Sequence, residues 1–389
     1  MEPSDSTSDR SGRLRRGPAG YWAFVPNPLP PALDLTGRLV SRLALAERSL
    51  GRLAGVSATL PNPYLLIGPF VRREAVLSSR IEGTMASLSD LLFFEAAPNL
   101  QPRASDVRGV ANYVQAMDWA LSPSRALPIS LRLIRELHRR LMTGVRGSHL
   151  TPGQFRTSQN WIGAPGCTLD QAKFIPPPVQ EMLESLDVFE KYLHAPSELP
   201  SLVRLAIVHY QFEAIHPFLD GNGRVGRLLI TLLLCEEELL PSPLLYLSAF
   251  FERRRQEYYG LLLDVSQRGQ WEAWIDYFLE GVAEQSLDAV ERSRRLRALH
   301  AEYHGRLQKA RASALLLKLV DALCASPAVT IGGASKMLKV THRAATLNIG
   351  KLVEAGILEE VTGKPRNRVF VARDIIRTVE EDLPPSSLT

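Results

Sequence analysis

The segment HPFLDGNGRVGR, residues 216–227, gathers on one turn the side chains that phosphate chemistry needs. Gly221 and Gly223 allow positive φ angles and close backbone approach, so successive N–H groups can form an anion site at a helix N-terminus. Arg224 and Arg227 are three residues apart and share one helix face, where two guanidinium groups repel each other unless an anion lies between them. The pattern therefore favours a bound phosphate.

The same turn carries an acid and a base. Asp220, next to a phosphate site, is a suitable Mg²⁺ ligand because magnesium usually takes one or two carboxylates together with phosphate oxygens. His216 titrates near neutral pH and can accept a proton from a hydroxyl group. The residues alone thus predict bound Mg²⁺–polyphosphate and transfer of a phosphoryl or nucleotidyl group to a hydroxyl. The alternative, a glycine-rich turn with incidental charges, does not account for the combination.

Helices are expected to hold this turn in place, because the sequences on both sides of it are strongly apolar. LVRLAIVHYQFEAI precedes the turn and LLITLLLC follows it, which indicates two buried helices. Helical spacing predicts a mainly α fold with helices over 34–60, 70–82, 87–94, 107–121, 130–142, 179–193, 202–215, 223–239 and 248–308. Residues 151–178, rich in Gly, Pro and aromatic side chains, are predicted to form a hairpin or flap between helices.

HPFLDGNGRVGR resembles the signature of the Fic (filamentation induced by cAMP) family, H-x-F-x-(D/E)-G-N-G-R-x-x-R, without a departure. The resemblance implies transfer of AMP from ATP to a Tyr, Thr or Ser hydroxyl of a target protein, with release of pyrophosphate. It implies that His216 is the base and Asp220 the Mg²⁺ ligand. Phosphorylating relatives carry lysine in place of Gly223, so this glycine favours nucleotide transfer. The implied nucleotide contacts are Gly221, Asn222, Gly223, Arg224, Val225, Gly226 and Arg227.

A second motif precedes the first in the chain. Glu82 follows a predicted helix, where a carboxylate meets the negative end of the helix dipole and needs a partner. SSRIEG, residues 78–83, resembles the inhibitory motif (S/T)-x-x-x-E-(G/N) of Fic proteins, with Ser78, Glu82 and Gly83 at the motif positions. The resemblance implies that Glu82 pairs with Arg227 and blocks the γ-phosphate position. The alternatives are a pair with Arg80, contact with solvent, or a role of Glu82 in AMP removal.

Two further segments extend the resemblance. QFRTSQNWIG and FIPPP are similar to the Fic flap, which positions the target hydroxyl; packing alone is the alternative. The expected docking residues are Trp161, Ile162, Gly163, Phe174 and Ile175. Tyr258 and Tyr259 follow the signature in FERRRQEYYGLL, and one ring, by preference Tyr259, is expected to line the adenine pocket unless both serve packing.

The C-terminal residues are predicted to form a winged helix-turn-helix domain. Helices over 313–325, 331–338 and 341–355 precede two short strands, ILEEV and VFVA, which flank the turn TGKPRNR. Residues 336–373 contain eight Lys or Arg and three acidic residues, which favours DNA, although such domains also serve as dimer or protein-docking modules. The candidate DNA contacts are Thr341, His342, Arg343, Lys364, Arg366 and Arg368.

The whole chain is then divided into a disordered tail (1–19), an N-terminal Fic-associated helical region (20–110), a Fic catalytic domain (111–285), a linker helix (286–310), the winged-helix domain (311–378) and a tail (379–389). The longest apolar run is residues 228–235, too short for a membrane span, and the three cysteines lack a metal-binding spacing. A cytoplasmic protein without a membrane partner is expected. The sequence is compatible with self-modification and with a homodimer. The rival function is a nucleotide-sensing DNA-binding regulator.

Overall fold

The computed structural model describes residues 8–17, 20–58, 64–98, 106–122, 125, 127–145, 151–164, 166–309, 313–363 and 366–381. The fold is mainly helical, as predicted. The helices before the signature turn are α1 (Gly37–Ala58), α2 (Tyr64–Ile81), α3 (Leu88–Ala96), α4 (Asp106–Ala120), α5 (Leu131–Met142), α6 (Val179–His194) and α7 (Ser201–Ile215). Those after it are α8 (Asn222–Glu236), α9 (Ser248–Arg253), α10 (Arg255–Arg268), α11 (Trp271–Lys309), α12 (Ala314–Ala325), α13 (Ile331–Leu338), α14 (His342–Glu354) and α15 (Arg373–Glu380).

The signature turn lies in the best-buried part of the molecule. Helices α7 and α8 pack against each other, and nearly every residue of both is buried. The buried Trp274 of α11 donates from Nε1 to the carbonyl of Ala206 in α7 at 2.8 Å. Because both flanking helices are fixed in the core, the turn between them has a fixed position.

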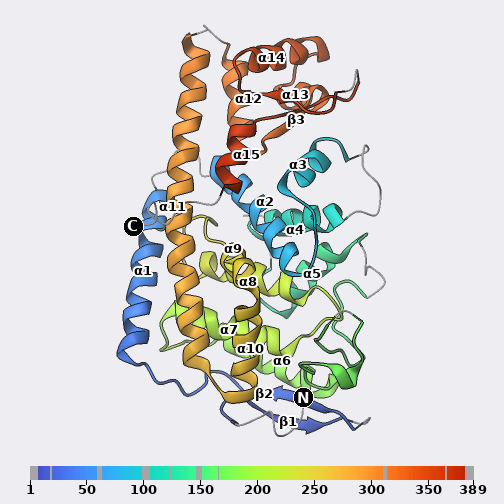
Figure 1. The fold of residues 1–389 in the computed structure, drawn as a ribbon, viewed down its shortest axis with the longest axis vertical. Coiled ribbons are helices and arrows are strands. Elements are labelled where there is room, and N and C mark those ends of the chain that lie inside the picture. Colours follow the sequence, from blue (N-terminus) through green and yellow to red (C-terminus); the bar gives the residue numbers. More distant parts are fainter. Residues whose placement is uncertain are drawn as a thin grey trace.

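Helix α11 runs along much of the length of the molecule, with α1 packed beside it (Figure 1). Arg38 and Arg42 of α1 form ion pairs with Asp276 of α11 at 2.9 and 3.2 Å. Helices were predicted through 248–308, and Arg254 and Gly269, which leave helical geometry, divide this stretch into α9, α10 and α11. The predicted boundary between residues 285 and 286 falls inside α11.

The N-terminal residues correct the prediction of a disordered tail over 1–19. Residues 1–7 and 18–19 lie outside the described part, but β1 (Gly12–Arg16) pairs antiparallel with β2 (Trp22–Pro26). Strand β2 buries Ala23, Phe24 and Val25. Because β2 is buried, solvent cannot satisfy its backbone N–H and carbonyl groups. Strand β1 supplies hydrogen-bond partners for them.

The predicted flap is a loop closed by a single β-bridge rather than a hairpin with regular strands. Ile162 donates its N–H to the carbonyl of Phe174 at 2.9 Å, and the loop between them contains the short 3₁₀ helix η3 (Leu169–Gln171). Three prolines, residues 176–178, follow directly and cannot donate to a strand ladder. The bridge therefore does not extend.

The C-terminal elements keep the predicted order and add to it. A short strand β3 (Ala328–Thr330) precedes α13, and β4 (Glu359–Glu360) and β5 (Val369–Val371) follow α14, forming an antiparallel sheet in the order β3–β5–β4. Helix α15 enters the predicted tail from residue 379, where Val379 is buried, while residues 382–389 lie outside the described part. The winged-helix assignment stays a prediction.

The C-terminal module, which comprises the described residues between 313 and 381, contacts α2 directly. Helices α12 and α15 pack against α2, at the upper end of the molecule in Figure 1. Arg72 of α2 donates from Nη1 to the carbonyl of Ala325 at 3.2 Å. Among the helices in the described part, none combines the length and apolar character that crossing a bilayer requires.

Candidate active site

The signature turn is held by its own side chains. His216 ends α7 in the left-handed region (φ 49°, ψ 61°), and Gly221, with φ 82°, precedes α8. The side chain of Asn222 accepts from the N–H of Phe218 and donates to its carbonyl, both at 2.8 Å. The ring of Phe218 is fully buried and anchors the turn in the core.

The ring of His216 is set up as an acceptor. Its Nδ1 lies 3.2 Å from the carbonyl oxygen of Glu213, which can only accept, so Nδ1 carries the proton. No described residue bonds to Nε2 of His216, which therefore keeps its lone pair. Burial lowers the pKa of His216 to about 4, so the ring is neutral at pH 7 and can take a proton.

Asp220 and Arg224 form the outer part of the site. Oδ1 of Asp220 accepts from the N–H of Gly221 at 2.6 Å and lies 3.6 Å from Nη2 of Arg224, while nearly half of the carboxylate side chain is exposed. Nε of Arg224 is buried and has no hydrogen-bond partner among the described residues. An exposed carboxylate beside an anion site at a helix N-terminus is a donor set that fits Mg²⁺ bound to phosphate.

Glu82 occupies the inner part of the site. Nη2 of Arg227 donates to Oε1 of Glu82 at 2.6 Å and to the carbonyl of Ser78 at 2.9 Å, and Nε donates to the Ser78 hydroxyl at 2.9 Å. The predicted pair between Glu82 and Arg227 is thus present. Gly223 makes room for it, because a Cβ there would lie 2.3 Å from Oε1 of Glu82.

Electrostatics keep this pair ionised. Burial alone would raise the pKa of Glu82, but the charge of Arg227 and its hydrogen bond outweigh that and hold the pKa below its ordinary value. Burial alone would lower the pKa of Arg227, which the charge of Glu82 raises instead. The pair is therefore a charged hydrogen bond between a buried guanidinium and a carboxylate that reaches the surface of the site.

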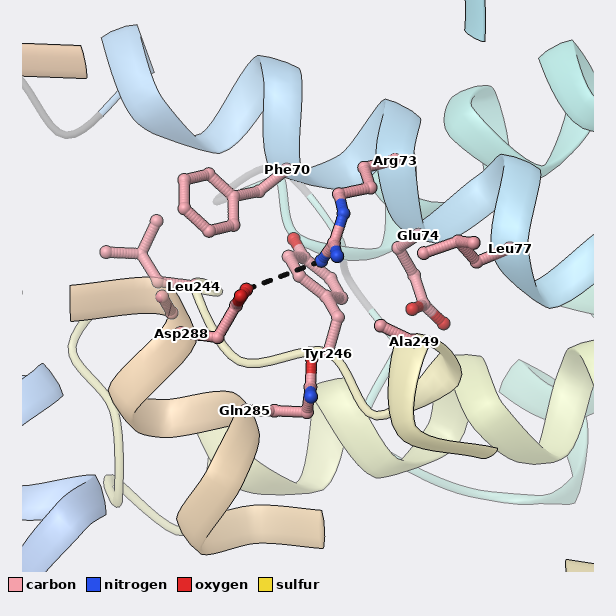
Figure 2. A pocket seen from close by; sticks show the side chains of 10 residues that line it. Phe70, Arg73, Glu74, Leu77, Leu244, Tyr246, Ala249, Gln285 and Asp288 are labelled. Carbon is pink, nitrogen blue, oxygen red and sulfur yellow. Dashed lines mark ion pairs between the residues drawn. The ribbon is translucent and has the colours of Figure 1, made fainter. Parts of the chain in front are cut away.

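Helix α2 is anchored about two turns before Glu82. Figure 2 shows Arg73 and Glu74 of α2 pointing toward α11 and the segment that carries Tyr246 and Ala249. Arg73 pairs with Asp288 of α11 at 3.5 Å, and Oε1 of the buried Glu74 accepts from Ser248 at 2.5 Å and from Tyr113 at 3.1 Å. These contacts fix the helix that presents Glu82.

His138 of α5 positions the turn, a role that the sequence did not indicate. Its Nδ1 accepts from the N–H of Gly153 at 2.9 Å, so Nε2 carries the proton and donates to the carbonyl of Asp220 at 2.9 Å. The ring also stacks on Phe218 with centroids 3.8 Å apart. Burial lowers the pKa of His138 to about 4, which keeps this tautomer neutral.

Arg156 joins the turn to the flap and was also missed. Its side chain is almost fully buried, and it donates from Nε to the carbonyl of His216 at 3.1 Å and from Nη2 to the carbonyl of Pro177. Its backbone N–H donates to Pro217 at 2.9 Å. Arg156 lies in the segment that resembles the flap. Its partner His216 is 60 residues away in the chain, so residue spacing does not predict this contact.

Two family regions match the chain around this site. The region described as "Fic/DOC family N-terminal" matches residues 40–122, and that described as "Fic/DOC family" matches residues 128–234, which include the signature turn. The chain carries a Fic N-terminal and a Fic domain.

Curated Fic relatives share part of the chain. The protein adenylyltransferase Fic of Drosophila erecta is 29% identical over 187 residues, covering 46% of this chain and 33% of that protein. The protein of the same name from Drosophila melanogaster is also 29% identical over 187 residues and is covered to 34%. The chain thus spans about a third of the length of these relatives.

Solved Fic structures share the fold. A Fic family protein from Desulfovibrio desulfuricans G20 superposes with a TM-score of 0.55 at 18% identity, covering 88% of this chain and 98% of that one. Fic-1 from C. elegans superposes with a TM-score of 0.50 at 22% identity, covering 65% of this chain and 73% of that one.

The other predicted nucleotide contacts do not all face the opening of the site. Val225 is fully buried, and Gly226 lies against Phe212 of α7, so neither faces the opening of the site. Tyr258 is also buried, with its hydroxyl 2.8 Å from Nε2 of His209, which places it in the core. Tyr259 is 39% exposed, and its pKa is raised to about 12 by burial and then by the nearby charge of Glu82.

The predicted docking residues of the Fic flap fall into two groups. Trp161 and Ile162 are exposed, and Nε1 of Trp161 donates to the carbonyl of Cys167 at 2.9 Å. Phe174 and Ile175 are buried, and the carbonyl of Ile175 accepts from the N–H of Phe24 in β2 at 2.8 Å. Phe174 and Ile175 therefore support the flap from the core and cannot contact a target directly. Gly163 packs closely against Cys167.

The candidate DNA contacts lie far from the signature turn, at the opposite end of the long helix from β1 and β2 (Figure 1). His342, Arg343 and Arg366 are exposed, whereas Lys364 lies outside the described residues. The hydroxyl of Thr341 accepts from the N–H of Ala344 at 3.3 Å and caps α14, so it is engaged within the module. Arg368 lies over the ring of Phe370, 5.4 Å from its centroid.

Proposed function

We propose that this chain is a self-inhibited, Mg²⁺-dependent protein adenylyltransferase, which transfers AMP from ATP to a Tyr, Thr or Ser hydroxyl of a target protein. One observation carries the proposal: a single turn holds the unbonded Nε2 of His216, the exposed carboxylate of Asp220 and the two guanidinium groups of Arg224 and Arg227. The match to the Fic/DOC family and the relatives named protein adenylyltransferase support it.

In this reaction His216 acts as the general base. Nε2 takes the proton of the target hydroxyl while the hydroxyl oxygen forms a bond to the α-phosphorus of ATP. The bond between that phosphorus and the oxygen bridging to the β-phosphorus breaks, and pyrophosphate leaves. The neutral ring, with its proton fixed on Nδ1 by Glu213, enters the reaction in the form that can accept.

The remaining residues hold the phosphates. The N–H groups at the start of α8 and the free Nε of Arg224 face anionic oxygens, and Asp220 would hold Mg²⁺. When bound, Mg²⁺ neutralises charge that builds up on the leaving pyrophosphate. Arg227 would grip the γ-phosphate, but its Nη2 is engaged by Glu82, so ATP meets an occupied position.

Transfer of the α-phosphoryl label tests the reaction class. The protein with Glu82→Gly is incubated with Mg²⁺ and ATP labelled at either the α- or the γ-phosphate, with and without a cell lysate. We expect α-label on protein, no γ-label, and loss of the α-label when His216→Ala is added. Label from the γ-position would indicate phosphoryl transfer instead, and no label at all from a variant that binds ATP would contradict the proposal.

Removal of AMP is the second candidate, and one observation favours it. Glu82 is held ionised at the phosphate cradle, where a carboxylate can orient a water molecule. The wild-type chain would then release AMP from a modified protein, and Glu82→Gly would lose this release while gaining transfer. Equal release by both would exclude this role of Glu82.

We also propose that the C-terminal module binds DNA through α14. The exposed His342 and Arg343 at the start of that helix and the exposed Arg366 support it. Binding to duplex DNA should weaken steeply as salt rises, because released counterions drive it. No binding at low salt would leave protein docking or a homodimer as the role of the module. Self-modification and a nucleotide-sensing role also stay predictions.

A further inference from the structure

A polar cluster joins α11 to α12, outside the Fic site. His300 and His304 lie one turn apart on α11, and Asp321 lies on α12. Oδ1 of Asp321 is 2.7 Å from Nε2 of His300 and 3.0 Å from Nε2 of His304. All three side chains are half-buried, and the reaction proposed above uses none of them.

These atoms converge as metal ligands do. One ligand atom of each of the three residues lies within 4.8 Å of the other two, and the two rings have centroids 4.2 Å apart. Zinc–ligand bonds of about 2.0–2.2 Å in tetrahedral geometry place neighbouring ligand atoms about 3.3–3.6 Å apart. The distances of 2.7 and 3.0 Å to Asp321 would need to open by about 0.3–0.9 Å to admit such an ion.

The two histidines converge on one oxygen of the same carboxylate. Both imidazoles are directed at Oδ1 of Asp321, so without a metal ion each must carry its proton on Nε2 and share one acceptor. A divalent cation would satisfy two neutral imidazoles and one carboxylate together.

We propose that His300, His304 and Asp321 bind a divalent transition-metal ion, with Zn²⁺ the best match to two imidazoles and one carboxylate. Two histidines four residues apart on one helix face are a recurrent zinc-binding arrangement. Here Ala301 follows the first histidine, where metalloproteases place a catalytic glutamate, and Glu302 is paired with Arg306 at 2.5 Å. Three protein ligands would leave the fourth position of a tetrahedral ion to water, and the ion would tie α12, and with it the C-terminal module, to α11.

Zinc binding to the full-length chain tests the site. Metal-stripped protein is titrated with Zn²⁺ by calorimetry, and bound zinc is counted by elemental analysis after dialysis. The compared proteins are the wild type, His300→Ala/His304→Ala, Asp321→Asn and a control, His194→Ala/His342→Ala, which removes two exposed histidines elsewhere. Loss of residues that only orient zinc ligands costs about 10- to 100-fold in affinity, so loss of direct ligands should weaken binding by about 100-fold or more.

Two further readouts separate this site from others. Asp220→Ala should keep the tight zinc site, because the signature turn does not contribute to it. Zinc should raise the unfolding temperature of the wild type and of the control, but not that of Asp321→Asn, which preserves the size of the side chain. No zinc uptake by the wild type, or equal affinity in the wild type and both cluster variants, would overturn the proposal.

Discussion

Nη2 of Arg227, in the second turn of α8, lies 2.6 Å from Oε1 of Glu82, which directly follows α2 and stands 145 residues earlier in the chain. The hydroxyl and carbonyl of Ser78 hold the same guanidinium from one turn further back. The segment matched as the Fic N-terminal region thus places one carboxylate beside the signature turn. Whatever holds α2 in place also holds this carboxylate in place.

Acid should destabilise the protein through its buried histidines. His209 is almost fully buried, and burial, followed by the charge of Arg227, lowers its pKa to about 3. An unfolded histidine has a pKa of about 6.5, so below that pH the unfolded state binds more protons and the free energy of unfolding falls. Each such histidine contributes a slope of up to about 1.4 kcal/mol per pH unit.

The contribution of His209 can be isolated by His209→Gln, which keeps a hydrogen-bonding partner for Tyr258 but does not titrate. Urea unfolding between pH 7 and pH 4 should show a smaller loss of free energy for this variant than for the wild type. The exposed His342→Gln serves as the matched control and should leave the slope unchanged. The same slope in all three proteins would show that His209 does not titrate as argued.

Arg156→Ala should weaken both the fold and the reaction. It removes the side-chain donor to the carbonyl of Pro177 and one of two side-chain donors to the carbonyl of His216, and a buried polar group left without a partner costs about 1–3 kcal/mol. The free energy of unfolding should fall by that amount. AMP transfer in the Glu82→Gly background should fall as well, because the carbonyl of His216 then keeps only the longer hydrogen bond from Asn160, at 3.3 Å.

The matched control for this variant is Arg139→Ala, whose side chain is 52% exposed and pairs with Glu136. A surface pair of this kind contributes about 0–1 kcal/mol. Urea unfolding and labelling rates measured side by side would contradict the positioning role of Arg156 if both variants behaved alike.

Gly68→Ala should displace the C-terminal module from α2. A Cβ at Gly68 would lie 2.2 Å from the carbonyl oxygen of Ala325, a backbone atom that cannot move without moving α12. We expect a lower unfolding temperature and faster proteolysis near the junction with α12. Gly55→Ala in α1 is the control, because a Cβ there meets open space and alanine stabilises a helix interior by about 0.5–1 kcal/mol. An equal or higher unfolding temperature for Gly68→Ala would contradict the tight contact.

Local patterns were sufficient for the helices and for much of the site. Apolar spacing located most helices, and the glycine at position 83 marked the end of α2. Both motifs consist of neighbouring residues whose spacing along the chain reflects their spacing on a helix or turn. The resemblance to Fic proteins supplied the contact between them.

Contacts between distant segments were not accessible in the same way. Strand β1 forms because β2 needs a partner, although GRLRR reads as a charged tail by composition. His138 and Arg156 donate to backbone carbonyls. Every residue has a backbone carbonyl, so the residue types do not indicate which one a side chain will contact. The buried positions of Tyr258 and Val225 also depend on which helix face meets the core, and both stretches are apolar or aromatic on more than one face.

The rate of AMP transfer with and without Glu82 tests the central claim most directly. Initial rates of labelling from α-labelled ATP would be compared for the wild type, Glu82→Ala and Glu252→Ala, the last removing a glutamate whose partner is Arg80, at 3.8 Å, outside the phosphate site. A hydrogen bond to a charged group is worth about 1.5–3 kcal/mol, so freeing Arg227 should raise the rate about 10- to 100-fold. We expect that rise for Glu82→Ala alone. A rate that stays at the wild-type level in Glu82→Ala, in a protein that folds and binds ATP, would contradict the claim that Glu82 restrains the site.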